Sequence, residues 1–145
     1  MLSSARPLMD SPLPNLSGFT ILVIEDDLDS LETLTTALTA CGARVLSALD
    51  TALARSYFET TQIDVVVTDL GLPGESGAAF LTWLRRQPRD KGRSTAAIVI
   101  TGYPQEFPAV RLGGFAAYFQ KPIDLLNVCM TIGAILRPPS GPSTR

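Results

Sequence analysis

Five polar side chains of this 145-residue chain follow apolar stretches, and their types could together bind a cation and an anion. They are Glu25, Asp26, Asp69, Thr101 and Lys121. Because the carboxyl ends of parallel strands meet at one edge of a sheet, we expect these side chains to converge. Three carboxylates about 4 Å apart repel one another by roughly 4 kcal/mol per pair at an effective dielectric constant of about 20. A cation must offset this repulsion, and the candidates are Lys121 and a bound Mg²⁺, which prefers hard oxygen ligands.

Each of these residues also has a simpler interpretation. The acidic run 25–27 is suited to capping the helix that follows it, although capping needs only one of the three carboxylates. Asp69 is suited to a turn, Thr101 to a strand end and Lys121 to the solvated surface. Taken singly, the simpler interpretations are favoured. Their occurrence together at matching strand ends favours a shared site.

The elements that must position these residues are short, continuous apolar runs. The central run, IDVVVTD at 63–69, does not alternate with polar residues, which indicates a strand buried on both faces of a parallel sheet. Further strands are expected at 19–24, 44–48, 96–100 and 116–119. Helical patterns separate these strands. The alternation predicts an α/β fold, namely a flavodoxin-like doubly wound five-stranded parallel sheet of order 2-1-3-4-5 with helices on both faces.

Two helical segments carry specific expectations. The last helix, from about 123 to 136, is expected to turn Leu126, Met130 and either Ile132 or Ala134 inward. The segment 102–117 should hold another helix, but it contains Pro104 and Pro108. An interior proline costs a helix about 3 kcal/mol, so we expect this helix to be short or displaced.

Composition limits the possible functions. The net charge is −2, without a basic run, which argues against non-specific nucleic-acid binding. The chain has no histidine, which excludes histidine-based catalysis and a zinc site with histidine ligands. Cys41 and Cys129 fit no metal-ligand spacing and are expected to be core thiols in a reducing cytoplasm. No apolar run approaches the roughly 20 residues that cross a bilayer. One domain is expected at 18–137, with flexible tails at 1–17 and 138–145.

The chain resembles the receiver domains of bacterial two-component response regulators, in particular the single-domain chemotaxis type. The resemblance covers about residues 18–136 and rests on four motifs in order, ILVIEDD, VVVTDLGLPGESG, IVITG and YFQKP. It implies that Asp69 accepts a phosphoryl group from a histidine kinase. It also implies that Glu25 and Asp26 hold Mg²⁺ together with Asp69 and the backbone carbonyl of Gly71.

The same resemblance implies roles at the other strand ends. Thr101 and Lys121 would bind the phosphoryl oxygens, so that both join Asp69 in the reaction, and Tyr118 would be the aromatic switch residue. The bond between Lys121 and Pro122 would be a cis peptide. Gly71 and Tyr103 occupy the positions that tune dephosphorylation. Because neither has a carboxylate or amide side chain to orient water, we expect a long-lived phosphorylated form.

The resulting hypothesis is a phosphoacceptor protein of a phosphorelay rather than a dedicated enzyme. Its phosphoryl donor would be a sensor histidine kinase or a histidine phosphotransfer protein. Only a short tail follows the last helix, so we expect signalling by protein contact, without direct binding to nucleic acid or membrane. The sequence does not identify the downstream protein target, and it is compatible with a homodimer.

Other functions remain open to comparison. A phosphate sink or relay intermediate would use the same chemistry. An unphosphorylated pseudo-receiver interaction module would keep only the fold, and the complete set of site residues counts against it. An aspartyl phosphatase usually has D-x-D after its first strand, whereas here that strand ends in EDD. A dinucleotide-binding domain would need G-x-G-x-x-G, which the chain lacks.

Overall fold

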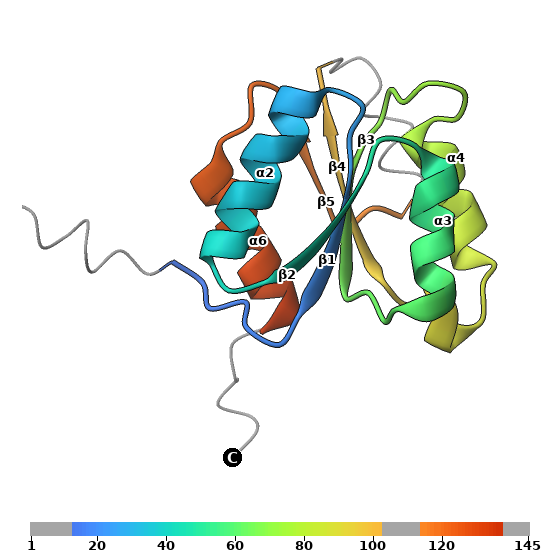
Figure 1. Ribbon diagram of the computed structural model, residues 1–145, viewed down its shortest axis with the longest axis horizontal. Helices are drawn as coiled ribbons and strands as arrows, with labels where there is room; N and C mark the ends of the chain where they lie inside the picture. Colours follow the sequence, from blue (N-terminus) through green and yellow to red (C-terminus); the bar gives the residue numbers. More distant parts are fainter. Residues whose placement is uncertain (1–12, 103–113, 138–145) are drawn as a thin grey trace, which may run out of the picture.

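Five parallel strands form one sheet in the order β2-β1-β3-β4-β5, in a computed structural model that describes residues 13–102 and 114–137 (Figure 1). The strands are β1 (Thr20–Ile24), β2 (Arg44–Ala48), β3 (Val65–Asp69), β4 (Ala96–Thr101) and β5 (Ala117–Gln120). The order confirms the predicted flavodoxin-like, doubly wound topology. The chain adds β2 on one side of β1 and then adds β3, β4 and β5 on the other side. Ligands of such sheets bind at this switch point, between β1 and β3.

Helices cover both faces of the sheet (Figure 1). The helices α2 (Leu28–Ala40) and α6 (Leu125–Leu136) lie on one face, and α3 (Thr51–Thr60) and α4 (Gly77–Arg85) lie on the other. A 3-10 turn, η2 (Arg89–Lys91), follows α4. Each of the four α-helices in the described part of the chain begins after a residue whose side chain accepts a backbone N–H of the first turn, which stabilises the helix start. These capping residues are Asp27, Asp50, Ser76 and Asp124.

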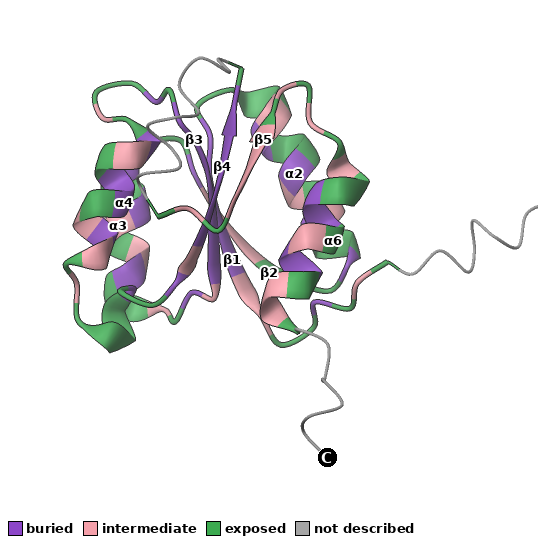
Figure 2. Ribbon diagram, turned by 180° about the vertical axis from the view of Figure 1, so that it is seen from behind, coloured by how far each residue is buried: buried purple, intermediate pink, exposed green. Residues whose placement is uncertain are grey.

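The central strand β3 supplies side chains to two separate cores. Val65 and Val67 pack under α2 and α6, whereas Val66 packs under α3 and α4. Successive side chains of a strand point to opposite faces, so a strand covered by helices on both sides must be apolar at every position. Every residue of β3 is buried (Figure 2). This explains the uninterrupted apolar run in the sequence.

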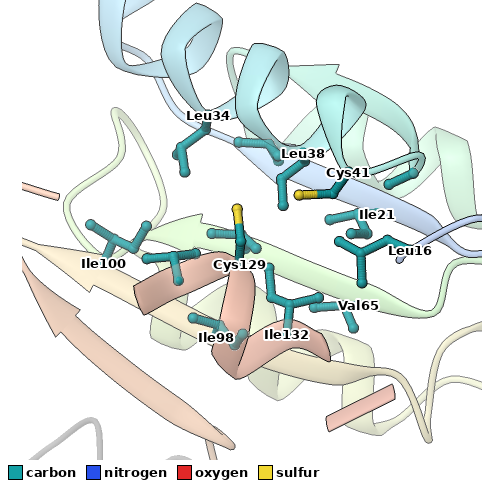
Figure 3. Close-up of a cluster of buried hydrophobic side chains, with 14 of the residues drawn as sticks. Leu16, Ile21, Leu34, Leu38, Cys41, Val65, Ile98, Ile100, Cys129 and Ile132 are labelled. Carbon is teal, nitrogen blue, oxygen red and sulfur yellow. The ribbon is translucent and has the colours of Figure 1, made fainter. Parts of the chain in front are cut away.

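The segment before β1 packs against the domain. The sequence predicts a flexible tail at 1–17, yet Leu16 is completely buried among the side chains shown in Figure 3. Its N–H donates to the carbonyl of Cys41 at 2.8 Å, and the guanidinium of Arg137 donates to the carbonyl of Ser17 at 3.1 Å. Leu16 and Ser17 are therefore held on the folded domain, whereas Leu13 is exposed; residues 1–12 and 138–145 lie outside the described part of the chain.

The inward face of α6 differs in part from the prediction, which is confirmed at Ile132 and wrong at Leu126 and Met130. Leu126 and Met130 are 52% and 41% exposed, whereas Val128, Cys129 and Ile132 are buried. Nearly every residue of this helix is apolar, so the sequence has no polar face that marks its orientation. Contacts with the sheet and with α2 decide which side is buried.

The two cysteines lie in the core. Cys41 and Cys129 are buried free thiols, as predicted, and burial together with the neighbouring Cys41 raises the pKa of the Cys129 thiol to about 12.

The region expected to hold a short or displaced helix lies mostly within 103–113, outside the described residues. Among the helices that the structure describes, none has the length and apolar character to cross a membrane.

Packing of the N-terminal segment leads to a test of the domain boundary. We expect Leu16→Ala to lower the free energy of unfolding by about 2–5 kcal/mol, because it removes a fully buried side chain from the core. The matched control is Leu13→Ala, since Leu13 is 57% exposed and its loss should change stability by less than about 0.5 kcal/mol. Urea unfolding of both variants measures this difference. Equal stability of the two would show that the segment 13–17 does not belong to the domain.

Candidate functional site

Three carboxylates meet at the carboxyl edge of the sheet. Glu25 and Asp26 follow β1, and Asp69 ends the neighbouring strand β3. One oxygen from each of these side chains lies within 4.8 Å of the others. The predicted convergence of the three acids is therefore present, and it results directly from the adjacency of β1 and β3.

Lys121 lies between two of these acids. Its Nζ donates to Oδ2 of Asp69 at 2.8 Å and forms an ion pair with Oε1 of Glu25 at 3.0 Å. The backbone helps to place it, because the N–H of Lys121 donates to the carbonyl of Thr101 at 2.8 Å. The peptide bond between Lys121 and Pro122 is cis, as predicted. The ammonium is thus positioned to reduce the repulsion between Glu25 and Asp69.

The site has more acidic than basic side chains. The pKa of Glu25 is raised, mainly by burial and further by the negative charge of Asp69. Hydrogen bonds from the Asp27 N–H and from Lys121 lower the pKa and offset part of this rise. Burial alone would lower the pKa of Lys121, but its hydrogen bonds to Asp69 and Glu25, and their negative charges, outweigh burial and raise it. When all three acids are ionised, one ammonium faces three carboxylates. Two negative charges remain, which suits a divalent cation.

The three neighbouring acids 25–27 have separate roles. Asp27 caps α2, because its Oδ2 accepts the N–H of Ser30 at 3.0 Å and the hydroxyl of Ser30 at 2.6 Å. Glu25 is buried and its Oε2 accepts the N–H of Asp27 at 3.0 Å. Asp26 is exposed at the mouth of the cluster. The capping interpretation therefore applies to Asp27, and Asp26 is left as an accessible oxygen ligand.

The loop after β3 is fitted closely to Asp69. The N–H of Gly71 donates to Oδ1 of Asp69 at 3.0 Å, and the N–H of Gly77 donates to the carbonyl of Leu70 at 2.8 Å. A Cβ on Gly77 would lie 2.5 Å from the carbonyl oxygen of Asp69, closer than any real contact of this kind. Only glycine fits at this position. The sequence shows Gly77 in the loop, but its contact with Asp69 requires folded coordinates.

The remaining predicted site residues lie at or near the same edge. Thr101 ends β4 and is completely buried. Tyr118 is partly buried in β5, where it pairs with Val99 and packs against Leu70 and Val99. The cluster against which Tyr118 packs includes Leu70, the residue that follows Asp69. Tyr103, predicted to tune dephosphorylation, lies outside the described residues.

The donor set fits a magnesium ion. Carboxylate oxygens are the hard ligands that Mg²⁺ prefers, and Mg²⁺ usually keeps several water ligands. Glu25 and Asp69 hold their carboxylates against the protein, whereas Asp26 is open to solvent. The cluster therefore offers oxygens from two buried side chains and from one that is open to solvent.

Comparison with known proteins matches this chain to one family. Residues 21–132 match the family of the response regulator receiver domain. An uncharacterised 14.6 kDa protein of Leptolyngbya boryana is 31% identical over 118 residues, which are 80% of this chain and 88% of that protein. The aerobic respiration control protein ArcA of Escherichia coli K12 is 31% identical over 128 residues, 79% of this chain. The chain spans only 51% of ArcA, and 28% of the similar regulator PgtA of Salmonella typhimurium.

Solved structures show the same fold. The CheY-like receiver domain of Methylobacillus flagellatus superimposes with a TM-score of 0.73 at 26% identity, covering 81% of this chain and 98% of that one. A receiver domain protein of Clostridium thermocellum has a TM-score of 0.71 at 28% identity, with coverage of 81% and 94%.

The division of roles among the three acids leads to a test with Mg²⁺. We expect Asp26→Asn to leave the metal-free protein at least as stable as the parent, since it removes one charge from a repulsive cluster. The same change should abolish most of the rise in melting temperature that Mg²⁺ produces by binding the folded state. Thermal unfolding with and without MgCl₂ measures both effects.

A neighbouring substitution with the same change of charge is the control. Asp27→Asn keeps a side-chain oxygen that can cap α2, so the response to Mg²⁺ should be largely retained. A smaller Mg²⁺ response in Asp27→Asn than in Asp26→Asn would mean that we have assigned the two acids the wrong way round.

Proposed function

The chain belongs to the response regulator receiver domain family, and we propose that it accepts a phosphoryl group on Asp69 from a sensor histidine kinase or a histidine phosphotransfer protein. Receiver domains act in two-component signalling and are not dedicated enzymes. The observation that supports Asp69 most strongly is its position among two other carboxylates and under the ammonium of Lys121. A solvent-exposed turn aspartate would have neither neighbour.

The geometry around Asp69 suits nucleophilic attack by a carboxylate. Its two oxygens are oriented separately, Oδ1 by the N–H of Gly71 and Oδ2 by Lys121. In the proposed step, a carboxylate oxygen forms a bond to phosphorus while the bond from phosphorus to the donor breaks, and the donor leaves with the electron pair. Lys121 then neutralises part of the charge on the phosphoryl oxygens. The fixed strand end keeps the carboxylate in place during the transfer.

Glu25, Asp26, Asp69 and the carbonyl of Gly71 would hold Mg²⁺. When bound, Mg²⁺ would supply positive charge next to the phosphoryl oxygens, as in other phosphoryl-transfer sites. The chain supplies the ligands at the ends of β1 and β3 and in the loop at 70–76.

We assign the response to phosphorylation to Thr101 and Tyr118. Thr101 lies at the end of β4, next to the strand that carries Asp69, and its hydroxyl would bind a phosphoryl oxygen. Tyr118 would then turn inward from its position beside Leu70 and Val99. One hydrogen bond formed only in the phosphorylated state biases such a two-state element by a few kcal/mol at most. The changed surface would be read by a partner protein.

We also propose that the protein is located in the cytoplasm. The buried free thiols of Cys41 and Cys129 support this, because they suit a reducing environment.

Phosphorylation of Asp69 is directly testable. We expect the protein to gain one phosphoryl group from acetyl phosphate in the presence of Mg²⁺, and Asp69→Asn to gain none. Intact mass spectrometry measures the gain, and chelation of Mg²⁺ should prevent it. The control is Asp64→Asn. Asp64 lies just before the end of β3 that is opposite to Asp69, and its Oδ2 accepts the N–H of Thr20 at 2.8 Å. A phosphoryl group on the Asp69→Asn protein would place the acceptor elsewhere.

The lifetime of the phosphorylated form is a further expectation. Gly71 is exposed and has no side chain to orient water, and Tyr103 is bulky and lacks a carboxylate or amide. We expect slow loss of the phosphoryl group, and faster loss after the double substitution Gly71→Asn with Tyr103→Glu. The decay of the phosphorylated mass after removal of acetyl phosphate measures both rates. A parent protein that decays as fast as the double variant would show that these two side chains do not control water access.

A further inference from the structure

An arginine on α3 reaches across to the loop that follows Asp69. The Nη2 atom of Arg55 contacts both carboxylate oxygens of Glu75. The guanidinium carbon of Arg55 also lies 5.3 Å from the ring centroid of Trp83, on α4. Both charged side chains are partly buried, with 34% of Arg55 and 26% of Glu75 exposed. One guanidinium thus joins α3, α4 and the loop at 70–76.

This loop is also fixed at its two ends. The N–H of Gly71 donates to Asp69 at the start, and at the end Ser76 caps α4 while Gly77 packs on the Asp69 carbonyl. Between the ends, the backbone of Gly74 has a φ of +79° and a Cβ there would meet nothing within 4 Å. Glu75 follows this open turn directly. Its ion pair therefore holds the loop between Leu72, which is buried in the core under α3 and α4, and the cap of α4.

The guanidinium of Arg55 makes its contacts through Nη2 and through its face. Its Nε is buried without a hydrogen-bond partner, which has an energetic cost. The same orientation places Nη2 on Glu75 and the guanidinium plane near the Trp83 ring. Trp83 itself packs against Phe58 and Phe80 of the core under α3 and α4. The guanidinium is therefore backed by rigid packing on one side and bound to the loop on the other.

We propose that Arg55, through Glu75, is a positioning residue of the phosphoacceptor site. Arg55 holds the loop at 70–76 so that Gly71 stays against Asp69 and the cation site at Asp69 is formed before Mg²⁺ binds. The inference rests on the proposed function for its effect on phosphorylation, but not for its effect on Mg²⁺ binding or loop motion. Without the ion pair, the loop samples more conformations, and Mg²⁺ must order it on binding. Affinity for Mg²⁺ should fall, whereas the rate at saturating Mg²⁺ should change little.

The test uses Arg55→Gln, Glu75→Gln and the double variant. We expect each single variant to raise the dissociation constant for Mg²⁺, measured by calorimetry, about three- to tenfold. The double variant should be no weaker than either single one, because both remove the same interaction. Acetyl phosphate reactions should need correspondingly more Mg²⁺ and reach a similar maximum rate. In the metal-free protein, backbone amides at 71–75 should exchange with deuterium faster.

The matched control is Arg85→Gln on α4. Arg85 donates to the carbonyls of Arg93 and Thr95 at 3.0 and 2.7 Å, so its loss also removes partly buried hydrogen bonds. These contacts lie beyond the C-terminal end of α4, before β4 begins, so affinity for Mg²⁺ and exchange at 71–75 should stay at parent values even if stability falls.

The outcomes distinguish the positioning role of Arg55 and Glu75 from the proposed phosphorylation of Asp69. Lower stability in Arg55→Gln and Glu75→Gln, with parent values for Mg²⁺ affinity and for exchange at 71–75, would overturn the positioning role. Additive effects in the double variant would also overturn it, since the residues would then act independently. A parent protein that binds Mg²⁺ but gains no phosphoryl group would contradict the proposed function. In that case a shift in Mg²⁺ affinity on loss of the pair would still support the positioning role.

Discussion

The ammonium of Lys121 is the contact on which the site depends, because it lies between the two buried carboxylates. Burying Glu25 and Asp69 near each other without a cation would be strongly unfavourable. Lys121 follows β5, and β4 separates β5 from β3, so the strands involved are about 10 Å apart. A lysine has a stem long enough to help cross this gap. The bond between its N–H and the Thr101 carbonyl directs its backbone toward the site.

The sequence predicts the sheet and the acidic cluster because both follow from burial. A strand with helices on both sides must be apolar throughout, and the polar residue that ends it must lie at the open edge of the sheet. The helix orientation and the domain boundary obey no such rule. Apolar α6 has no polar face to reveal its orientation, and Leu16 lies in a proline-containing segment whose composition predicts a tail. In both cases packing with distant residues decided the outcome.

The details of the site required coordinates for a similar reason. The acidic run 25–27 contains three chemically similar residues, and only the hydrogen bonds show that Asp27 caps α2 while Glu25 binds Lys121. The ion pair of Arg55 and Glu75 joins residues 20 positions apart. Arg55 lies in none of the four motifs, and Glu75 lies in the motif VVVTDLGLPGESG, which does not show which residue pairs with it. Contacts between a helix and a loop depend on how the helix is placed on the sheet, which local sequence does not specify.

The site combines a rigid part with an adjustable one. Asp69 and Thr101 end strands that are buried along their length, so moving them would disturb both cores. Asp26 and Gly71 are exposed on loops, where substitutions affect the core little. In the proposed function, the acceptor carboxylate of Asp69 is therefore tied to the stability of the domain. Asp26 and Gly71, which are proposed to affect metal binding and the lifetime of the phosphoryl group, lie outside the core.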